Sequence, residues 1–522
     1  MKFCGYVLFV MKRAIVLCPL VLCFACSDDT SVDTETSITS AGTGDSESGE
    51  EGSNFEPVPA RGVTLTGVTA NHGINVWIGQ DGNWVGPTER VGRLVTGRDT
   101  LFRVYHELDE DWVEREIEAR LLIDINGEQE VFTKRKILTT DTNDSYLDGA
   151  LWFALPAEEG YTEPNVAYQV SLWEVEPGGE GLEEHVTALP PNGPMIVGFE
   201  SIPMEMNVKF FPFNFNNRVP EYMDEAKMEI ITKEIYQTEP ITGLNTEMGA
   251  LQTEGANNNM CNMLGYMSQL WSAEGAPANV YYVGMVDTGA SSGIMGCATL
   301  FANINADVWV NDSMGITATS IVHEIGHNLG LRHVQCNDMG NPAADPDTSY
   351  PDHPLGRTLN TGFGIRDFSM YPGETTIDYM SYCTKRWVSP WTWGKIWPVI
   401  QNNTTLGSPF EVNPDPFPVL QLGIYPDGTT EWWTALSRMD LARNPPSGDA
   451  RVEFLTDGKV MHREPARLET LSDGASVWVT VPMPGGLEEA PFDAVRFTTI
   501  GGQIYEVTRD EVRFFTQMDF DL

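Results

Sequence analysis

Residues 323–333 of this chain read HEIGHNLGLRH. His323 and His327 are four positions apart, so on an α-helix they lie about one turn apart on the same face and both imidazoles can reach one point. Glu324 lies about 100° further round the helix axis, beside that point rather than on it. The spacing therefore predicts a helix with a polar face that carries two metal ligands and one carboxylate.

The third histidine, His333, requires the helix to end before it. A continued helix would carry it about 9 Å beyond His327, whereas a zinc–nitrogen bond is about 2 Å long. Gly330 fits the required turn, because glycine adopts the positive φ of a helix end without a Cβ clash. The helix face opposite the histidines is apolar and is expected to pack into a core: Ala318, Val322, Ile325 and Leu329.

The three histidines predict a zinc site. In a chain with eight histidines among 522 residues, a His-Glu-x-x-His string arises by accident in roughly one chain in a hundred, and the added Gly and His lower this to about one in 10⁵. Three neutral imidazoles leave a fourth zinc position open for water. We expect one catalytic zinc ion bound by His323, His327 and His333.

The stretch from His323 to His333 resembles the extended zinc signature of the metzincin metalloendopeptidases. That family also has a methionine-containing turn beneath the metal. Residues 378–383, DYMSYC, look like this turn, with Met380 as its methionine. A helix expected to begin near Ser389-Pro390 would close the region below the metal.

Two residues near these motifs bear on the type of metzincin. Tyr382 matches the tyrosine that astacin-like and serralysin-like members bring to the zinc or to the transition state; the alternative is a buried aromatic side chain with a satisfied hydroxyl. Val334 follows the third histidine and matches none of the acidic, serine or proline versions found there. The sequence therefore leaves the subfamily and the substrate open.

The resemblance implies a zinc endopeptidase that hydrolyses extracellular proteins or glycoproteins. Glu324 would be the general base for the attacking water, and Tyr382 would donate a hydrogen bond to the developing oxyanion. The alternative is a surface-anchored binding or adhesion lipoprotein whose protease domain is vestigial. The intact ligands and Glu324 favour the enzyme.

The N-terminus predicts export. Lys12 and Arg13 precede an apolar run, residues 14–25, that is too short to span a bilayer and has the form of a secretory signal. Cys26 ends the run, as in lipoprotein signals where that cysteine is lipidated. We therefore interpret residues 1–26 as a lipoprotein-type signal that anchors the protein to a membrane by lipid alone; the alternative is a cleaved signal and a secreted protein.

Composition agrees with an exported protein. Residues 27–57 are rich in Ser, Thr, Gly, Asp and Glu, so they cannot bury enough apolar surface to fold and predict a disordered acidic linker. The net charge of −42 argues against nucleic acid as a partner. We expect a monomer.

Four of the eight cysteines lie in the region around the histidine stretch: Cys261, Cys297, Cys336 and Cys383. Four cysteines allow three pairings. Cys336 lies three residues after His333, and Cys383 three after Met380, so these two belong to segments that should converge under the zinc. This predicts disulfides Cys336–Cys383 and Cys261–Cys297, with free thiols as the alternative that an oxidising compartment disfavours.

The rest of the chain predicts an α+β multidomain protein. Short alternating runs such as Leu101–Tyr105 and Glu118–Ile123 predict an antiparallel β-sandwich over 58–203. The metzincin-like catalytic domain is expected over 204–403, and a second β domain over 404–522.

Within the catalytic domain the pattern alternates between strands and helices. The expected strands are 207–211, 280–283 and 306–310, and the expected helices begin near Pro220 and near Met260. In the family an edge strand before the zinc helix pairs with extended substrate, and Ile294–Phe301 is the candidate, with a plain loop as the alternative.

Two further segments leave alternatives open. Residues 334–377 lack periodicity and are expected to shape the cleft; their aspartates raise a calcium hypothesis, although no fixed ligand spacing supports it. Tryptophans of the C-terminal region such as Trp432, Trp433 and Trp478 would stack on sugars if exposed, and burial is the expected default.

Overall fold

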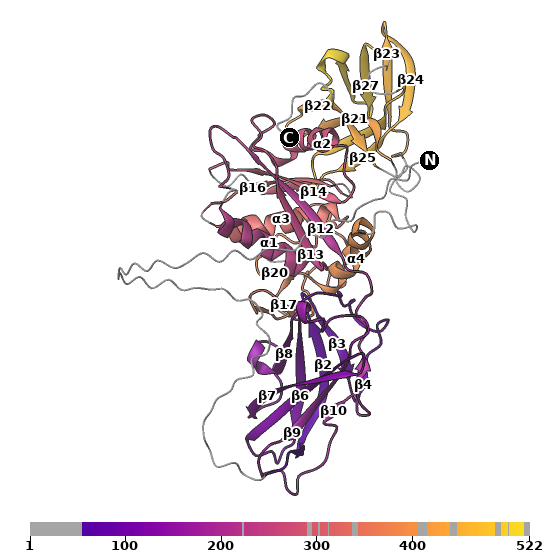
Figure 1. The fold of residues 1–522 in the computed structure, drawn as a ribbon. Coiled ribbons are helices and arrows are strands. Elements are labelled where there is room, and N and C mark those ends of the chain that lie inside the picture. Colours follow the sequence, from indigo (N-terminus) through magenta and orange to yellow (C-terminus); the bar gives the residue numbers. More distant parts are fainter. Residues whose placement is uncertain are drawn as a thin grey trace, which may run out of the picture. The chain divides into compact units, whose positions relative to one another are not determined.

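The computed structural model is a mixed α+β protein with four α-helices and mainly antiparallel sheets in its described part (Figure 1). The residues described are 55–221, 224–289, 295–300, 303–311, 313–336, 343–404, 415–438, 446–485, 492–499 and 501–515. All of them belong to one compact unit. The expected signal 1–26 with Cys26, and nearly all of the acidic segment 27–57, lie outside the described residues. Among the helices described, none has the length and apolar character needed to cross a membrane.

The N-terminal part contains two antiparallel sheets that pack on each other. Strand β9 alternates buried and part-exposed side chains, and its buried Tyr168 lies with its ring centroid 5.0 Å from that of Phe102 on the other sheet. The first sheet has the order β1 (Val58–Pro59), β9 (Ala167–Glu174), β6 (Arg115–Ile125) and β7 (Glu128–Leu138), with β10 (Ala188–Leu189) and β11 (Met195–Ile196) also on β9. The second has the order β4 (Asn83–Trp84), β3 (Asn75–Gln80), β2 (Val63–Asn71), β5 (Thr100–Leu108) and β8 (Leu151–Leu155).

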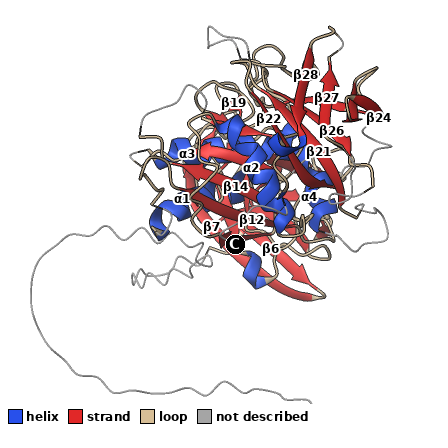
Figure 2. Cartoon of the chain, turned by 90° about the horizontal axis from the view of Figure 1, so that it is seen from above, coloured by secondary structure: helices blue, strands red, loops and turns tan. Residues whose placement is uncertain are grey.

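The central part is a five-stranded sheet with helices on both faces (Figure 2). Its order is β13 (Gly243–Met248), β12 (Glu205–Phe213), β14 (Val280–Val286), β16 (Ile304–Val308) and β15 (Gly296–Ala298). The first four strands are parallel, and β15 runs antiparallel to β16 at the edge. Successive side chains of a strand point to opposite faces, so Phe210 packs with helices α1 (Glu225–Thr238) and α3 (Met314–Asn328), whereas Phe211 packs with α2 (Met260–Ala273).

Helix α1 begins later than the sequence predicted. The Asp224 side chain accepts hydrogen bonds from the backbone N–H groups of Ala226 and Lys227 at 3.1 and 3.3 Å. This N-cap satisfies donors that would otherwise be unpaired at the helix start, so the helix starts at Glu225 and not near Pro220. Helices α2 and α4 (Pro390–Thr404) start where they were predicted.

The C-terminal part contains two four-stranded antiparallel sheets. Trp432, Trp433 and Trp478 are at most 4% exposed, so the expectation of buried tryptophans is confirmed and sugar stacking on these three rings is excluded. One sheet has the order β22 (Thr430–Ser437), β21 (Phe417–Ile424), β26 (Val477–Pro482) and β25 (Arg467–Thr470). The other has the order β24 (Lys459–Pro465), β23 (Arg451–Thr456), β27 (Ala494–Thr498) and β28 (Ile504–Thr508).

The part of the segment between α3 and α4 that the structure describes is mostly irregular, as its lack of periodicity predicted. It contains two short strand pairs: β17 (Gly362–Phe363) with β18 (Met370–Tyr371), and β19 (Ile377–Asp378) with β20 (Arg386–Trp387). Single 3₁₀ turns elsewhere cover Leu147–Gly149, Ala157–Glu159 and Arg509–Glu511.

The N-terminal sheets and the central sheet share one hydrophobic core. Fully buried Arg98 lies between them, and its guanidinium donates to the carbonyl oxygens of Tyr236, Glu239 and Ile241 at 2.6 to 2.7 Å. These carbonyls lie at the C-terminal end of α1 and just beyond it, where helical acceptors have no partner within the helix. An arginine from the connection between β4 and β5 therefore completes the hydrogen bonding of a helix in the central part.

Candidate metal centre

Three buried histidines meet at one point beside the central sheet. His323 and His327 lie on α3, which ends at Asn328, and Gly330 then adopts a φ of 91° as predicted for the turn. The turn returns His333 to the helix, and the three side chains are 1 to 4% exposed. The Nε2 atom of His327 lies 3.2 Å from the Nε2 atoms of both other histidines.

The other ring nitrogen of each histidine faces a backbone carbonyl. The Nδ1 atoms of His323, His327 and His333 lie 3.0, 2.7 and 2.5 Å from the carbonyl oxygens of Tyr379, Leu331 and Ala344. A carbonyl oxygen only accepts hydrogen bonds, so each Nδ1 carries the proton and each Nε2 presents a lone pair to the common point. Burial lowers the pKa of all three imidazoles, which keeps them neutral as metal ligands require.

The spacing of the three lone pairs fits a bound metal ion. Zinc–nitrogen bonds of about 2.0–2.1 Å in a tetrahedral site place neighbouring ligand nitrogens about 3.3 Å apart. This is close to the 3.2 Å that separates the His327 Nε2 atom from each of the other two, and the three ligand atoms all lie within 4.8 Å of one another. Lone pairs at this distance repel each other unless a cation lies between them. The group can therefore hold a metal ion, as predicted from the sequence.

Met380 lies directly beneath this group. It is fully buried, and a Cβ atom added to Gly326 would lie only 2.5 Å from its sulfur. Gly326 therefore allows the methionine to approach the helix between the two histidines. Val334, also fully buried, donates its backbone N–H to the Met380 carbonyl at 3.0 Å. The fully buried Asp378 orders the turn by accepting the Met380 N–H at 2.9 Å.

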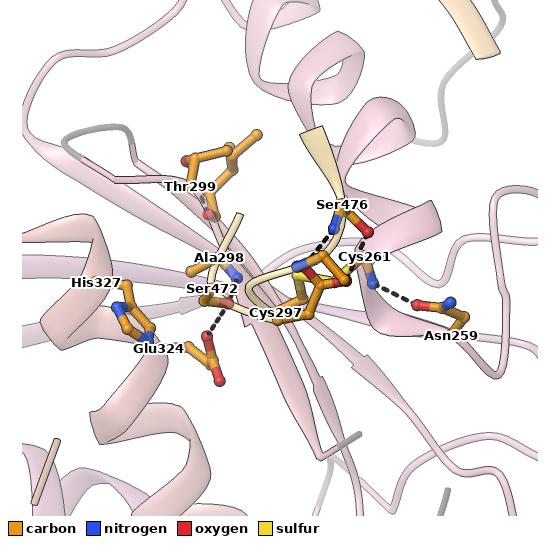
Figure 3. Close-up of a disulfide and its surroundings, with 12 residues drawn as sticks. Asn259, Cys261, Cys297, Ala298, Thr299, Glu324, His327, Ser472 and Ser476 are labelled. Atoms are coloured by element: carbon orange, nitrogen blue, oxygen red, sulfur yellow. Dashed lines mark hydrogen bonds between the residues drawn. A yellow bond between two sulfur atoms is a disulfide. The ribbon is translucent and has the colours of Figure 1, made fainter. Parts of the chain in front are cut away.

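Both predicted disulfides are present. Cys336 is bonded to Cys383, and Cys261 is bonded to Cys297 (Figure 3). The first joins the segment after His333 to the segment after Met380, and the second joins α2 to the edge strand β15. Two disulfides are compatible with an extracellular protein.

Glu324 lies beside the histidines and is 5% exposed. Burial, and after it the charge of Asp307 on β16, raise its pKa well above the ordinary range. A Cβ atom on Gly296 would lie 2.6 Å from Glu324 Oε1 and 2.8 Å from Asp307 Oδ1, so the absence of a side chain at Gly296 leaves room for both carboxyl groups under the edge strand. A cation at the histidine group would act against these effects and favour the carboxylate.

Tyr382 is near the metal group, but it is not a buried aromatic. Its side chain is 41% exposed, and its hydroxyl lies 2.7 Å from the Nε2 atom of His333. Because that nitrogen has no proton, the hydroxyl donates to it and is directed at the point where the three lone pairs meet. The alternative of a buried ring is therefore wrong.

Two residues of the site were missed by the sequence analysis. Asp307 is fully buried, with Oδ1 accepting from Ser320 at 2.9 Å. A single acid within the otherwise apolar expected strand 306–310 was the available signal. Ser472 comes from the C-terminal part and donates to Glu324 Oε2 at 3.2 Å (Figure 3). A separation of 148 residues gives no local signal for this contact.

The aspartates that raised the calcium hypothesis pair with basic side chains where they are described. The ion pairs are Asp345 with Arg332, Asp347 with Lys395, Asp352 with Arg357, and Asp367 with Lys233, at 3.1, 2.8, 2.9 and 3.1 Å. Between residues 343 and 377, cations of the protein itself therefore neutralise these carboxylates. The expected edge strand Ile294–Phe301 is described only from Met295 to Leu300, with β15 at its centre; its two end residues lie outside the described part.

Comparison with known proteins adds no assignment. No protein-family model matches the sequence, and no curated protein matches it either.

Proposed function

We propose that this chain is a zinc-dependent endopeptidase of the metzincin type. The single observation that carries the proposal is the convergence of three unprotonated Nε2 atoms, each fixed by a carbonyl at Nδ1, with a buried glutamate next in sequence to the first of them. Three neutral imidazoles with one open position are a typical catalytic zinc set, whereas structural zinc sites have four protein ligands. The methionine beneath the helix and the tyrosine beside His333 support the same assignment.

Bound zinc would supply a water of lowered pKa and would polarise the scissile carbonyl. Glu324 would accept the proton of the attacking water and pass it to the leaving amine. A cation bound by the histidines would act against the effect of burial on the pKa of Glu324 and favour the carboxylate, the form that a general base requires. Tyr382, with its hydroxyl at the third ligand, would donate a hydrogen bond to the oxyanion.

The substrates we propose are extracellular proteins or glycoproteins. The two disulfides support export of the protein, and the apolar run that ends at Cys26 supports attachment by a lipid. Val334 is buried against the methionine turn, so it supports packing and gives no direct indication of subfamily or cleavage preference.

The test is zinc content together with cleavage of a proteome-derived library of short peptides. The wild-type protein should bind one zinc ion and cleave the library. Glu324→Ala should keep the zinc and lose at least about a hundredfold in rate, whereas Glu225→Ala, at an exposed position of α1, should change neither. Retained cleavage in Glu324→Ala, or a zinc-loaded wild-type protein that cleaves nothing, would contradict the proposal.

A further inference from the structure

The turn between β25 and β26, residues 471–476, enters the space between the edge strand and the candidate general base (Figure 3). Ser472 pairs with both backbone groups of Ala298 on β15. The Ala298 N–H donates to Ser472 Oγ at 2.9 Å, and the Ser472 N–H donates to the Ala298 carbonyl at 3.3 Å. The N–H and carbonyl groups of Ala298 that an added strand would need are therefore already hydrogen-bonded to Ser472.

The same serine side chain reaches the catalytic group. Ser472 Oγ donates to Glu324 Oε2 at 3.2 Å while it accepts from Ala298. One oxygen atom thus bridges the edge strand and the base. A peptide that is to be attacked beside Glu324, and that pairs with the edge strand as extended peptides pair with open sheet edges, requires this space.

The turn also reaches the other side of the metal group. A Cβ atom on Gly474 would lie 2.2 Å from the Cβ of Ala344, whose carbonyl accepts from the third ligand His333. On the edge-strand side, Glu469 at the base of the turn accepts the backbone N–H of Leu300 at 2.7 Å. The turn therefore extends from the edge strand to the segment that supports His333.

The turn has a rigid internal structure. Its ends are closed by a hydrogen bond from the Leu471 N–H to the Ser476 carbonyl at 2.9 Å. Asp473 accepts from the backbone N–H groups of Ala475 and Ser476 at 3.0 and 2.8 Å. Leu471 is 2% exposed and belongs to the core that contains both Cys261 and Cys297. These hydrogen bonds hold the shape of the turn, and its displacement has to withdraw Leu471 from the core and break the contacts of Ser472 with Ala298 and Glu324.

We infer that the 471–476 turn is an internal occupant of the substrate cleft. In the arrangement described, the C-terminal part blocks the edge strand beside Glu324, and an extended polypeptide binds only after the turn is displaced. This inference rests on the proposed function for its meaning, but occupation of the cleft can be measured without turnover.

The test compares two glycine variants of the full chain. Gly474→Leu adds a side chain where a single Cβ already meets Ala344, so it should push the turn out of the cleft. Gly458→Leu is the matched control: Gly458 has a φ of 69°, close to the 68° of Gly474, and nothing lies within 4 Å of its added Cβ. The two positions therefore have nearly the same positive φ, and only the side chain added at Gly474 meets a neighbour.

The probes are acetohydroxamate, which is small, and a six-residue peptide hydroxamate, measured by calorimetry on zinc-loaded protein. Gly474→Leu should bind the peptide hydroxamate at least tenfold more tightly than wild type and Gly458→Leu, with acetohydroxamate unchanged. In the wild-type protein the peptide hydroxamate should increase amide hydrogen exchange over residues 471–476. Equal peptide affinities in all three proteins, unchanged exchange, or no peptide binding at all would overturn the inference.

Cleavage rates separate this inference from the proposed function. If Gly474→Leu binds the peptide hydroxamate more tightly but none of the three proteins cleaves peptides, the inference that the turn occupies the cleft is supported and the proposed endopeptidase activity is contradicted. If the wild-type protein cleaves extended polypeptides as fast as Gly474→Leu, the proposed endopeptidase activity is supported and the inference that the turn occupies the cleft is overturned.

Discussion

The N-terminal and C-terminal sheets both contact the central part, but they contact it in different ways. The N-terminal sheets share its hydrophobic core, and Arg98, from the connection between β4 and β5, lies among the carbonyls at the end of α1. The C-terminal sheets pack on α2 and extend one turn to Glu324. The contacts of the N-terminal part stabilise α1 and the core around it. The contact of the C-terminal turn with Glu324 affects access to the histidines. The difference predicts that changes on the N-terminal side alter stability, whereas changes at the C-terminal turn alter binding.

The largest expected effect on stability is at Arg98. Arg98→Met keeps much of the apolar stem but leaves the carbonyls of Tyr236, Glu239 and Ile241 without their donor. Each unsatisfied buried acceptor costs about 1–3 kcal/mol, so the free energy of unfolding should fall by about 4 kcal/mol. Denaturant unfolding of the full chain measures it.

The control is Arg463→Met in the C-terminal part. The Arg463 side chain is 61% exposed and pairs with Glu453 at 2.7 Å, so its loss should change the free energy of unfolding by less than about 1 kcal/mol. Equal stability losses in the two variants would remove the contrast between the two interfaces.

The next effect is a pH dependence at Glu239, where the N-terminal and central parts meet. Burial raises the pKa of this carboxyl from its ordinary value of 4.5 to about 8, and Tyr379 donates to it at 3.1 Å. A raised carboxyl pKa means that the folded state binds the proton more tightly. The contribution of the Glu239 carboxyl to the free energy of unfolding is therefore full below pH 4.5 and is lost as the pH rises towards 8.

Glu239→Gln removes this dependence because the amide does not titrate. The stability of the variant relative to wild type should rise by about 3 kcal/mol between pH 4.5 and pH 7. Thermal or denaturant unfolding at both pH values measures the difference, with Glu225→Gln, an exposed position, as the control. A difference that stays constant with pH would show that Glu239 is ionised in the folded protein.

The smallest stability effect is expected at Ser472. Ser472→Ala removes the hydroxyl between Ala298 and Glu324 but keeps the backbone hydrogen bond to the Ala298 carbonyl. The free energy of unfolding should fall by about 1 kcal/mol, well below the loss in Arg98→Met. Amide exchange at Ala298 should nevertheless increase. A stability loss as large as that of Arg98→Met would mean that the turn is a structural contact of the same kind as the N-terminal interface.

A structural feature could be predicted from the sequence where it depends on residues that lie close together along the chain. The histidine group was predicted from its spacing on one helix and the turn after it, and Met380 from the resemblance of residues 378–383 to the metzincin turn. Cys336–Cys383 was predicted because its two segments should converge under the metal, and Cys261–Cys297 as the pair that then remains. The start of α1 was placed near Pro220 because proline favours the first turn of a helix, whereas the side-chain cap at Asp224 determines the actual start.

The remaining features depend on tertiary contacts. Asp307 lies near Glu324 only because β16 and α3 pack together. The Tyr382 hydroxyl reaches His333 only because the turn around Met380 packs against the segment after His333. Ser472 reaches the site through a hairpin of the C-terminal sheets, and no periodicity or spacing around residues 471–476 encodes that contact. The sequence therefore predicts the metal ligands better than the groups that control access to them.

The identity and ligands of the metal can be measured by X-ray absorption at the zinc edge of the purified full chain. We expect one zinc ion with three nitrogen ligands at about 2.0–2.1 Å and one oxygen ligand, with loss of the bound metal in His327→Ala. A chain that retains no zinc, or a spectrum with sulfur ligands at about 2.3 Å, would contradict this expectation.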